Sequence, residues 1–355
     1  MIISTCGFGS TGSSAVTDYL LECDDTQVFD NIEFTLTTAP DGLEDLEYHL
    51  MKCPNRLSSG IYAIQRFRKL IAQCSREWSV MTGIDRQTID RLTNEYLSSI
   101  TQLSFIGFSP AINQKYGHWL KHYIGDSLIL HRIIPWLEKK RIVKRNFDFY
   151  PLERVEAAIK PSNFYMASRM YVHNLLEAMG CDFKKNVILD QAFVGNNPAK
   201  SFPFYDDPYA IVVDRDPRDL YIFAKVKLLS RGRFMPTDTV ENFITYYRLL
   251  RDNQPYKQIN DRVLVISFED MVYNYDETVN KIDNFLHLKN NNRQTIFRPQ
   301  LSAANTNLVR RFPEFQDDIK IIEHSLSEYL FPFGNYSSIS NNGEMFFGKS
   351  PLNKQ

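Results

Sequence analysis

The strand–loop–helix pattern at the N-terminus constrains this fold more than any other part of the sequence. The apolar run "MIISTC" predicts a buried strand, the glycine-rich "GFGSTGSS" follows at residues 7–14, and "AVTDYLL" has a helical pattern. A turn of this kind directs backbone N–H groups and the positive end of the helix toward an anion. In parallel α/β sheets, ligands bind at the carboxyl ends of strands. The N-terminus therefore predicts an α/β protein with an anion-binding loop.

The loop fits two phosphate-binding patterns and completes neither. In the pattern G-x-x-x-x-G-K-[ST] both glycines and Ser14 are present, but Ser13 replaces the lysine that reaches the β- and γ-phosphates of ATP. ATP hydrolysis is therefore disfavoured. In the pattern G-x-G-x-x-G the glycines fit, and Asp30 lies about where a dinucleotide's ribose would be bound. An NAD(P)-dependent oxidoreductase is thus an alternative, and so is a tight turn without a ligand.

The rest of the chain alternates strands and helices at both ends. Strands are predicted at 26–34, 186–193, 209–216 and 262–270. Helices are predicted at 13–23, 41–51, 60–78, 85–103, 165–180, 239–253 and 275–288. This order predicts one three-layer domain over 1–355, with a parallel sheet flanked by helices. Residues 58–180 are expected to form a long helical insertion on the acceptor side, and a flexible tail is expected over 336–355.

Composition excludes several classes of protein. The net charge of −1 argues against a nucleic-acid-binding surface. The five cysteines are scattered without a C-x-x-C pair, so no metal site is predicted and a reducing compartment is expected. There is no apolar run of about 18 residues and no signal peptide, so we expect a cytoplasmic protein.

Two further motifs follow predicted strands. "YAIVVDRDPRDLY" places Arg215 just past a strand, where its charge would suit a second phosphate. The alternative is a simple helix start, with Asp216 as N-cap and Pro217 as the first helical residue. In that case Arg218 and Asp219 would be solvated. "RVLVISFEDMVYNYDETVNKIDNFL" has a strand that ends in Phe-Glu-Asp, before a helix that ends in Phe-Leu.

Together, the loop, "RDPRD" and "FED" resemble the motifs of the sulfotransferase family, which has a P-loop-like fold and uses 3′-phosphoadenosine 5′-phosphosulfate (PAPS). The resemblance covers the sheet-forming ends and not the helical block. It implies that Arg215 binds the 3′-phosphate and that Ser302 and Asn305, with Arg310, close over the nucleotide. It also implies that the loop holds the phosphosulfate through Gly9, Ser10, Thr11, Gly12, Ser13 and Ser14.

The chain departs from the family pattern at two positions. Ser10 stands where the family loop typically carries Lys or Arg, and Phe223 stands where the family usually has a serine on the 3′-phosphate. Lys225 or Lys227 would replace that serine. A nucleotide-binding protein without turnover is therefore a second alternative.

The family resemblance also implies an acceptor and a general base. Aromatic and basic residues between Tyr116 and Arg145 suit a sugar that carries carboxylates or sulfates, including a glycan linked to a membrane. The expected reaction is sulfuryl transfer from PAPS to a hydroxyl of a carbohydrate, either a glycan or a capsular polysaccharide precursor, which needs no metal and releases PAP. Glu33 is the predicted general base, Asp190 is its main competitor, and His131 is a third candidate.

Overall fold

The computed structural model describes residues 1–107, 128–140, 142, 152–228, 234–252, 260–288 and 294–336. The chain divides into two compact units, one made of 1–38 and 180–355 and the other of 39–179. The second unit therefore begins before residue 58, where the sequence placed the start of the helical insertion. Apart from Tyr336, the tail predicted over 336–355 lies outside the described residues.

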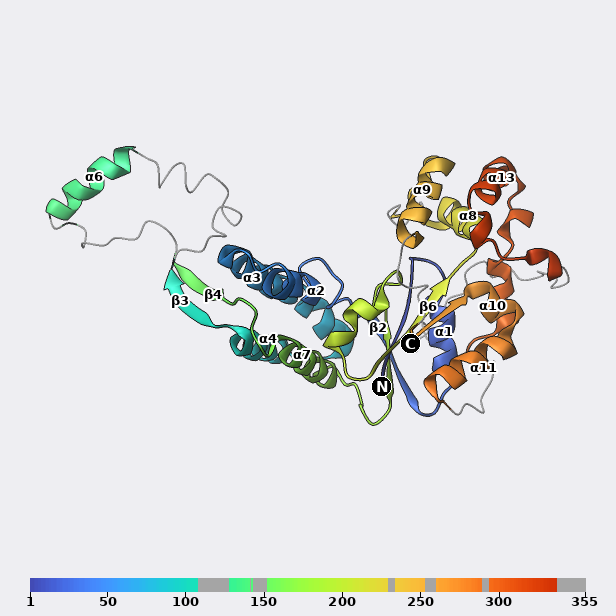
Figure 1. The fold of residues 1–355 in the computed structure, drawn as a ribbon, viewed down its shortest axis with the longest axis horizontal. Coiled ribbons are helices and arrows are strands. Elements are labelled where there is room, and N and C mark those ends of the chain that lie inside the picture. The colour runs from blue at the N-terminus through green and yellow to red at the C-terminus, as the bar shows by residue number, and fades with distance from the viewer. Residues whose placement is uncertain are drawn as a thin grey trace. The chain divides into compact units, whose positions relative to one another are not determined.

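The first unit is built on a parallel five-stranded sheet with the strand order β2-β5-β1-β6-β7 (Figure 1). The strands are β1 (Ile2–Gly7), β2 (Thr26–Glu33), β5 (Asn186–Asp190), β6 (Pro208–Asp214) and β7 (Val263–Ser267). Each predicted strand of the sheet is present. β1 lies in the middle and its first five residues are buried, as expected for a strand covered on both faces.

Helices flank this sheet, which confirms the α/β class. The helices of the unit are α1 (Ser13–Leu20), α8 (Pro217–Lys227), α9 (Val240–Arg251), α10 (Phe268–Tyr273), α11 (Tyr275–Leu286), α12 (Pro299–Ser302) and α13 (Gln316–Ser325). α1, α10 and α11 share one hydrophobic core with Ile3, Ile188 and Ile211 of the strands (Figure 1). α8, α9 and α13 pack together in a second core.

The second unit is mainly helical. It contains α2 (Leu43–Glu47), a π-helical turn (Tyr48–Lys52), α3 (Leu57–Thr82), α4 (Arg86–Ile100), α6 (Leu128–Lys139) and α7 (Phe164–Ala178). The α4–α7 contact is aromatic, because Tyr96 stacks on Tyr171 with ring centroids 4.7 Å apart. An antiparallel ribbon of β3 (Leu103–Gly107) and β4 (Glu153–Ala157) was not predicted. All the residues of β3 except Gly107 are exposed, so the strand has no alternation of buried and exposed side chains.

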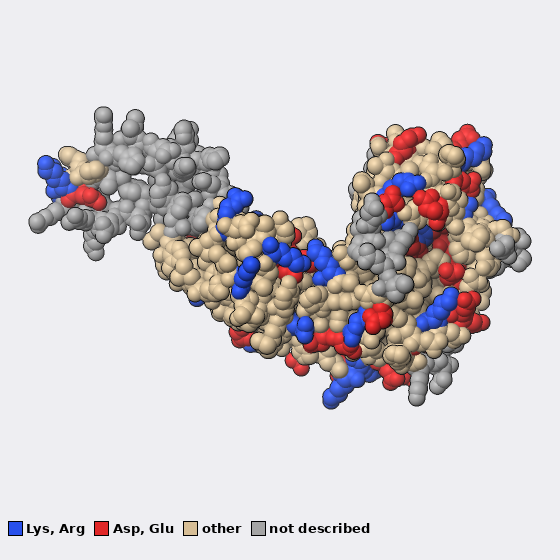
Figure 2. Space-filling view, viewed as in Figure 1, with Lys and Arg blue, Asp and Glu red and all other residues tan. Residues whose placement is uncertain are grey.

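On the face drawn in Figure 2, acidic and basic residues are interspersed, and no large patch carries charge of a single sign. Among the helices that the structure describes, none combines the length and the apolar character that a membrane crossing requires.

Candidate functional site

The loop after β1 has a backbone that favours glycine. Gly9, Ser10 and Gly12 have φ values of 82°, 57° and 93°. A Cβ on Gly12 would lie 2.5 Å from the ring of Phe268, so the close packing of the loop also requires glycine there. The loop leads into α1. The first N–H groups of a helix have no carbonyl one turn before them, so they have no partner within the helix.

Thr11 holds this loop together. Its Oγ1 accepts a hydrogen bond of 3.2 Å from the N–H of Phe8, and the residue is buried. A Cβ on Gly7 would lie 2.2 Å from the same oxygen. The Thr11 side chain therefore maintains the turn and does not line a cavity.

The loop borders a cavity of about 360 Å³, which we call the loop cavity. Many predicted site residues line it: Ser10, Gly12, Ser13, Ser14, Glu33, Asp190, Arg215, Ser302 and Asn305. Its size falls within the range of about 300–1,000 Å³ that is typical of small-molecule sites. The structure thus brings together residues that lie up to 295 positions apart in the sequence, from Ser10 to Asn305.

Arg215 is the only basic residue among the described residues that line the loop cavity. It follows β6, and its guanidinium donates through Nη1 to the carbonyl of Ser10 (3.2 Å) and through Nη2 to the carbonyl of Asn305. The rings of Phe223 and Phe268 lie on it, each with its centroid 5.3 Å from Cζ. The residue is 5% exposed, and its Nε has no hydrogen-bond partner within the described part of the chain. A buried donor without a partner is costly.

The residues after Arg215 begin a helix. They also anchor the segment that carries Asn305, which lines the loop cavity. Asp216 is the N-cap of α8, Pro217 is the first helical residue, and Asp216 also pairs with Arg218 at 2.7 Å. The capped helix start is therefore confirmed for Asp216 and Pro217, but the expectation that Arg218 and Asp219 are solvated was wrong, because both are largely buried and bonded within the protein. The buried carboxylate of Asp219 accepts the N–H groups of Asn307 and Leu308, each at 2.7 Å. This contact fixes the segment that carries Asn305.

Five of the predicted nucleotide-binding residues, among them Lys227 and Arg310, do not line the loop cavity. The side chain of Thr11 bonds to the N–H of Phe8 within the loop, and Gly9 lines a different cavity. Lys225 lies with its Nζ 5.4 Å from the ring centroid of Tyr221 and is absent from the lining. Phe223, at the family's serine position, instead stacks on Arg215.

Two carboxyl groups end neighbouring strands at the cavity. Glu33 of β2 pairs with Asp190 of β5 after an irregularity in β2 that shifts the register between Phe29 and Glu33. Burial, followed by the negative charges of Glu33 and Asp30, raises the pKa of Asp190 to about 7. Asp190 Oδ1 has no hydrogen-bond partner in the described regions. Burial and the charges of Asp30 and Glu22 likewise raise the pKa of Asp18, on α1, to about 6.

A second cavity, of about 670 Å³, adjoins the loop cavity. Ser10, Glu33 and Gln191 line both cavities. The second cavity also has aromatic and small polar walls, formed by Phe8, Phe193, Phe234, Tyr246, Thr35, Thr38 and Asn196. Because Glu33 faces both cavities, it lies at the junction between them.

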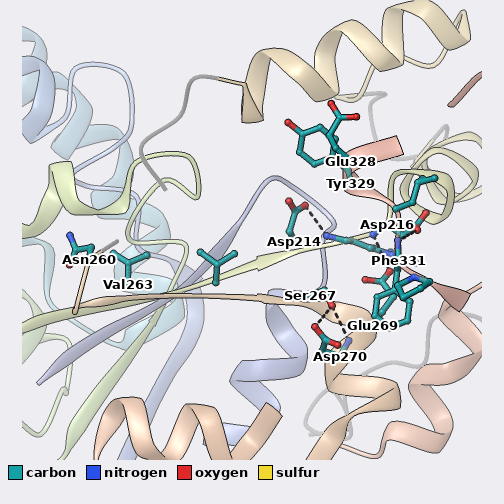
Figure 3. Close-up of a pocket in the computed structure, with 14 residues that line it drawn as sticks. Asp214, Asp216, Asn260, Val263, Ser267, Glu269, Asp270, Glu328, Tyr329 and Phe331 are labelled. Atoms are coloured by element: carbon teal, nitrogen blue, oxygen red, sulfur yellow. Dashed lines mark hydrogen bonds between the residues drawn. The ribbon is translucent and has the colours of Figure 1, made fainter. Parts of the chain in front are cut away.

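A third hollow lies beside the edge strand β7 (Figure 3). It is rich in carboxylates, and most of these are held by the protein's own groups, although Glu269 Oε2 has no partner among the described residues. Asp214 pairs with Arg251 at 2.6 Å, and Glu328 pairs with Arg248 at 3.1 Å. Asp270 accepts a 2.7 Å hydrogen bond from Ser267. We therefore do not assign a ligand to this hollow.

Several residues of the loop cavity were missed by the sequence analysis. Asp18 comes four residues after Ser14 in α1, so helical spacing would have placed both on one face. Gln191 directly follows Asp190, and its Nε2 donates to Ser13 Oγ at 2.9 Å. Phe297 had no signal in its local sequence. Within the described residues, no group of three or more His, Cys, Asp or Glu side chains could hold a metal ion.

Other positions named from the sequence lie outside the described residues. This applies to the aromatic and basic side chains at 116–123 and to the side chain of His131. Comparison of the chain with protein-family models, with curated proteins and with solved structures gave no match.

Proposed function

We propose that this protein is a PAPS-dependent sulfotransferase of P-loop-like fold that transfers a sulfuryl group to a carbohydrate hydroxyl. One observation carries the proposal. The loop cavity joins a glycine-rich turn, a buried arginine whose Nε has no hydrogen-bond partner among the described residues, and two strand-end carboxyl groups. An anionic donor and a proton acceptor would therefore meet in one place.

The residues present fit a phosphorylated nucleotide. The N–H groups of the loop and of the first turn of α1 would hold the phosphosulfate, with the hydroxyls of Ser13 and Ser14 as further donors. The Nε of Arg215 would bind the 3′-phosphate, and its two aromatic neighbours keep the guanidinium in place. Ser302 and Asn305 line the same cavity. The missing loop cation leaves the stabilisation of the leaving oxygen to backbone and hydroxyl donors.

The donor would supply an activated sulfuryl group, in which the bond from sulfur to the bridging phosphate oxygen breaks. The acceptor oxygen forms the new bond to sulfur and loses its proton. Glu33 is the proposed recipient of that proton, because its exposed carboxylate faces both cavities. Asp190 lies beside it, and its raised pKa lowers the negative charge that faces an anionic donor near neutral pH.

The strand order counts against the oxidoreductase alternative. In the dinucleotide-binding fold the second strand pairs with the first. Here β5 lies between β1 and β2, and β2 carries Asp30, the candidate ribose ligand. Asp30 also does not line the loop cavity.

The acceptor partner is proposed to be a glycan that is presented at a membrane surface. α6 exposes Ile133 and Trp136, which are 42% and 54% exposed, and Lys139 and Lys140 follow them. Apolar and aromatic residues next to lysines are typical of helices that lie on an anionic lipid surface. We propose that the protein acts in the cytoplasm.

Thermal unfolding with added ligands tests the donor assignment. PAP at 100 times its Kd should stabilise the protein by about 2.7 kcal/mol without magnesium. ATP and NADH at the same concentration should have much smaller effects. Stabilisation by NADH and none by PAP would contradict the proposal.

A further inference from the structure

The second cavity has the chemistry of a site for an uncharged, hydroxyl-rich molecule. Its polar walls include the side chains of Glu33, Thr35, Thr38 and Asn196, and none of these is hydrogen-bonded to another described residue. Glu33 is the last residue of β2, Thr35 and Thr38 follow it closely, and Asn196 comes six residues after the end of β5. Hydroxyl and amide groups of this kind can both donate and accept, which matches sugar hydroxyls.

Aromatic rings provide an apolar wall beside these groups. Phe234 is 51% exposed and lies against the loop, because a Cβ on Gly9 would come within 3.1 Å of its ring. Tyr246 of α9 is partly buried on the same cavity. Rings with an accessible face can pack against the C–H groups of a sugar ring.

The one charged side chain in the described lining of the second cavity is the carboxylate of Glu33. Glu33 is shared by both cavities, and Asp190 pairs with it on the neighbouring strand. The described lining of the second cavity includes no Lys, Arg or His. A carboxylate or sulfate on the acceptor would therefore lie near Glu33 with no counter-charge in that lining, and like charges placed together are unfavourable.

We propose that the second cavity is the acceptor site and that it selects an uncharged glycan, with Phe234 and Tyr246 against the sugar ring and Thr35, Thr38 and Asn196 on its hydroxyls. The inference rests on the proposed sulfotransferase function. It differs from the sequence-based expectation of an acceptor that carries carboxylates or sulfates, because that expectation relied on residues 116–145 and not on the cavity next to the loop. It also makes Phe234 a residue that determines specificity.

Matched acceptors test the charge selectivity. Oligosaccharides that contain hexuronates would be compared with their uncharged methyl esters, which keep the same hydroxyls, using PAPS labelled in its sulfuryl group. We expect kcat/KM to be about 100-fold higher for the neutral member of a pair. Calorimetry in the presence of PAP should likewise show tighter binding of the neutral member of each pair. Equal or better use of the uronates, or binding of neither member, would overturn the inference.

Variants test the site itself. Phe234→Ala should raise the acceptor KM about 10-fold and leave PAP affinity within twofold, whereas Phe234→Trp should retain a low KM. Phe105→Ala is the matched control, because Phe105 is 44% exposed and does not line the cavity. An unchanged acceptor KM in Phe234→Ala would contradict the assignment. If PAP does not bind to the wild-type protein, the proposed function fails first, and the two failures are thereby distinguished.

Discussion

The buried carboxyl of Asp190 should destabilise the folded protein at alkaline pH. Its pKa rises from an ordinary value near 4 to about 7, chiefly because of burial and then because of Glu33 and Asp30. A carboxyl with a raised pKa binds its proton more tightly in the folded state than in the unfolded state. Ionisation of the buried Asp190 therefore lowers the free energy of unfolding. This loss is absent below about pH 4, grows as the pH rises, and is complete above about pH 7.

The substitution Asp190→Asn removes this loss of stability. At about 1.36 kcal/mol per pH unit, the rise in pKa corresponds to an upper limit of about 4 kcal/mol at pH 8. Some of this is lost, since the amide must find partners of its own where Asp190 Oδ1 has none in the described regions. We expect Asp190→Asn to be more stable than wild type by about 2–4 kcal/mol at pH 8 and by close to zero at pH 4.

Urea unfolding at half-unit steps from pH 4 to pH 8.5 measures this difference. Glu33→Gln should give a smaller effect of the same sign, because it removes one neighbouring charge and leaves Asp190 buried. Lys184→Gln, at an exposed position, controls for a general change of net charge. A difference between Asp190→Asn and wild type that does not vary with pH would refute the reasoning.

Three further predictions concern binding and turnover. Glu33→Gln should lower kcat by about 10²- to 10⁴-fold while PAP affinity stays within about twofold; near-normal turnover would move the role of base to Asp190. Arg215→Ala should weaken PAP binding by about 1.5–3 kcal/mol and leave binding of adenosine 5′-phosphosulfate nearly unchanged; an equal loss for both nucleotides would make Arg215 structural. Trp136→Ala should reduce co-sedimentation with vesicles containing anionic lipid several-fold, whereas Lys184→Gln should not; unchanged sedimentation would remove α6 from any membrane contact.

The sheet and its cavity were accessible from the sequence because their signals are local. Buried parallel strands are short apolar runs, and the glycines of the loop mark a turn that few other residues can adopt. Glu33 and Arg215 could be placed at one edge because the carboxyl ends of parallel strands meet there.

The side chains that line the cavities were harder to predict because they depend on contacts between segments distant in the sequence. Nothing in the sequence near Phe223 shows that its ring lies on Arg215, and so Lys225 was assigned in its place. The second cavity brings together segments near residues 35, 195, 234 and 246, and no single motif covers them. The ribbon of β3 and β4 was missed because β3 is exposed and β4 buries three consecutive residues, so neither strand shows the alternation of buried and exposed side chains.

Transfer of labelled sulfate from PAPS tests the central claim most directly. Purified protein would be incubated with sulfuryl-labelled PAPS and neutral oligosaccharides, in the presence of a metal chelator. Label transfer and PAP release would be measured for wild type, Glu33→Gln and Phe105→Ala. The proposed function predicts label on the oligosaccharide and an equal amount of PAP for wild type and Phe105→Ala, with both reduced at least about 100-fold in Glu33→Gln. PAPS that remains intact with wild-type protein, together with no stabilisation by PAP, would contradict it.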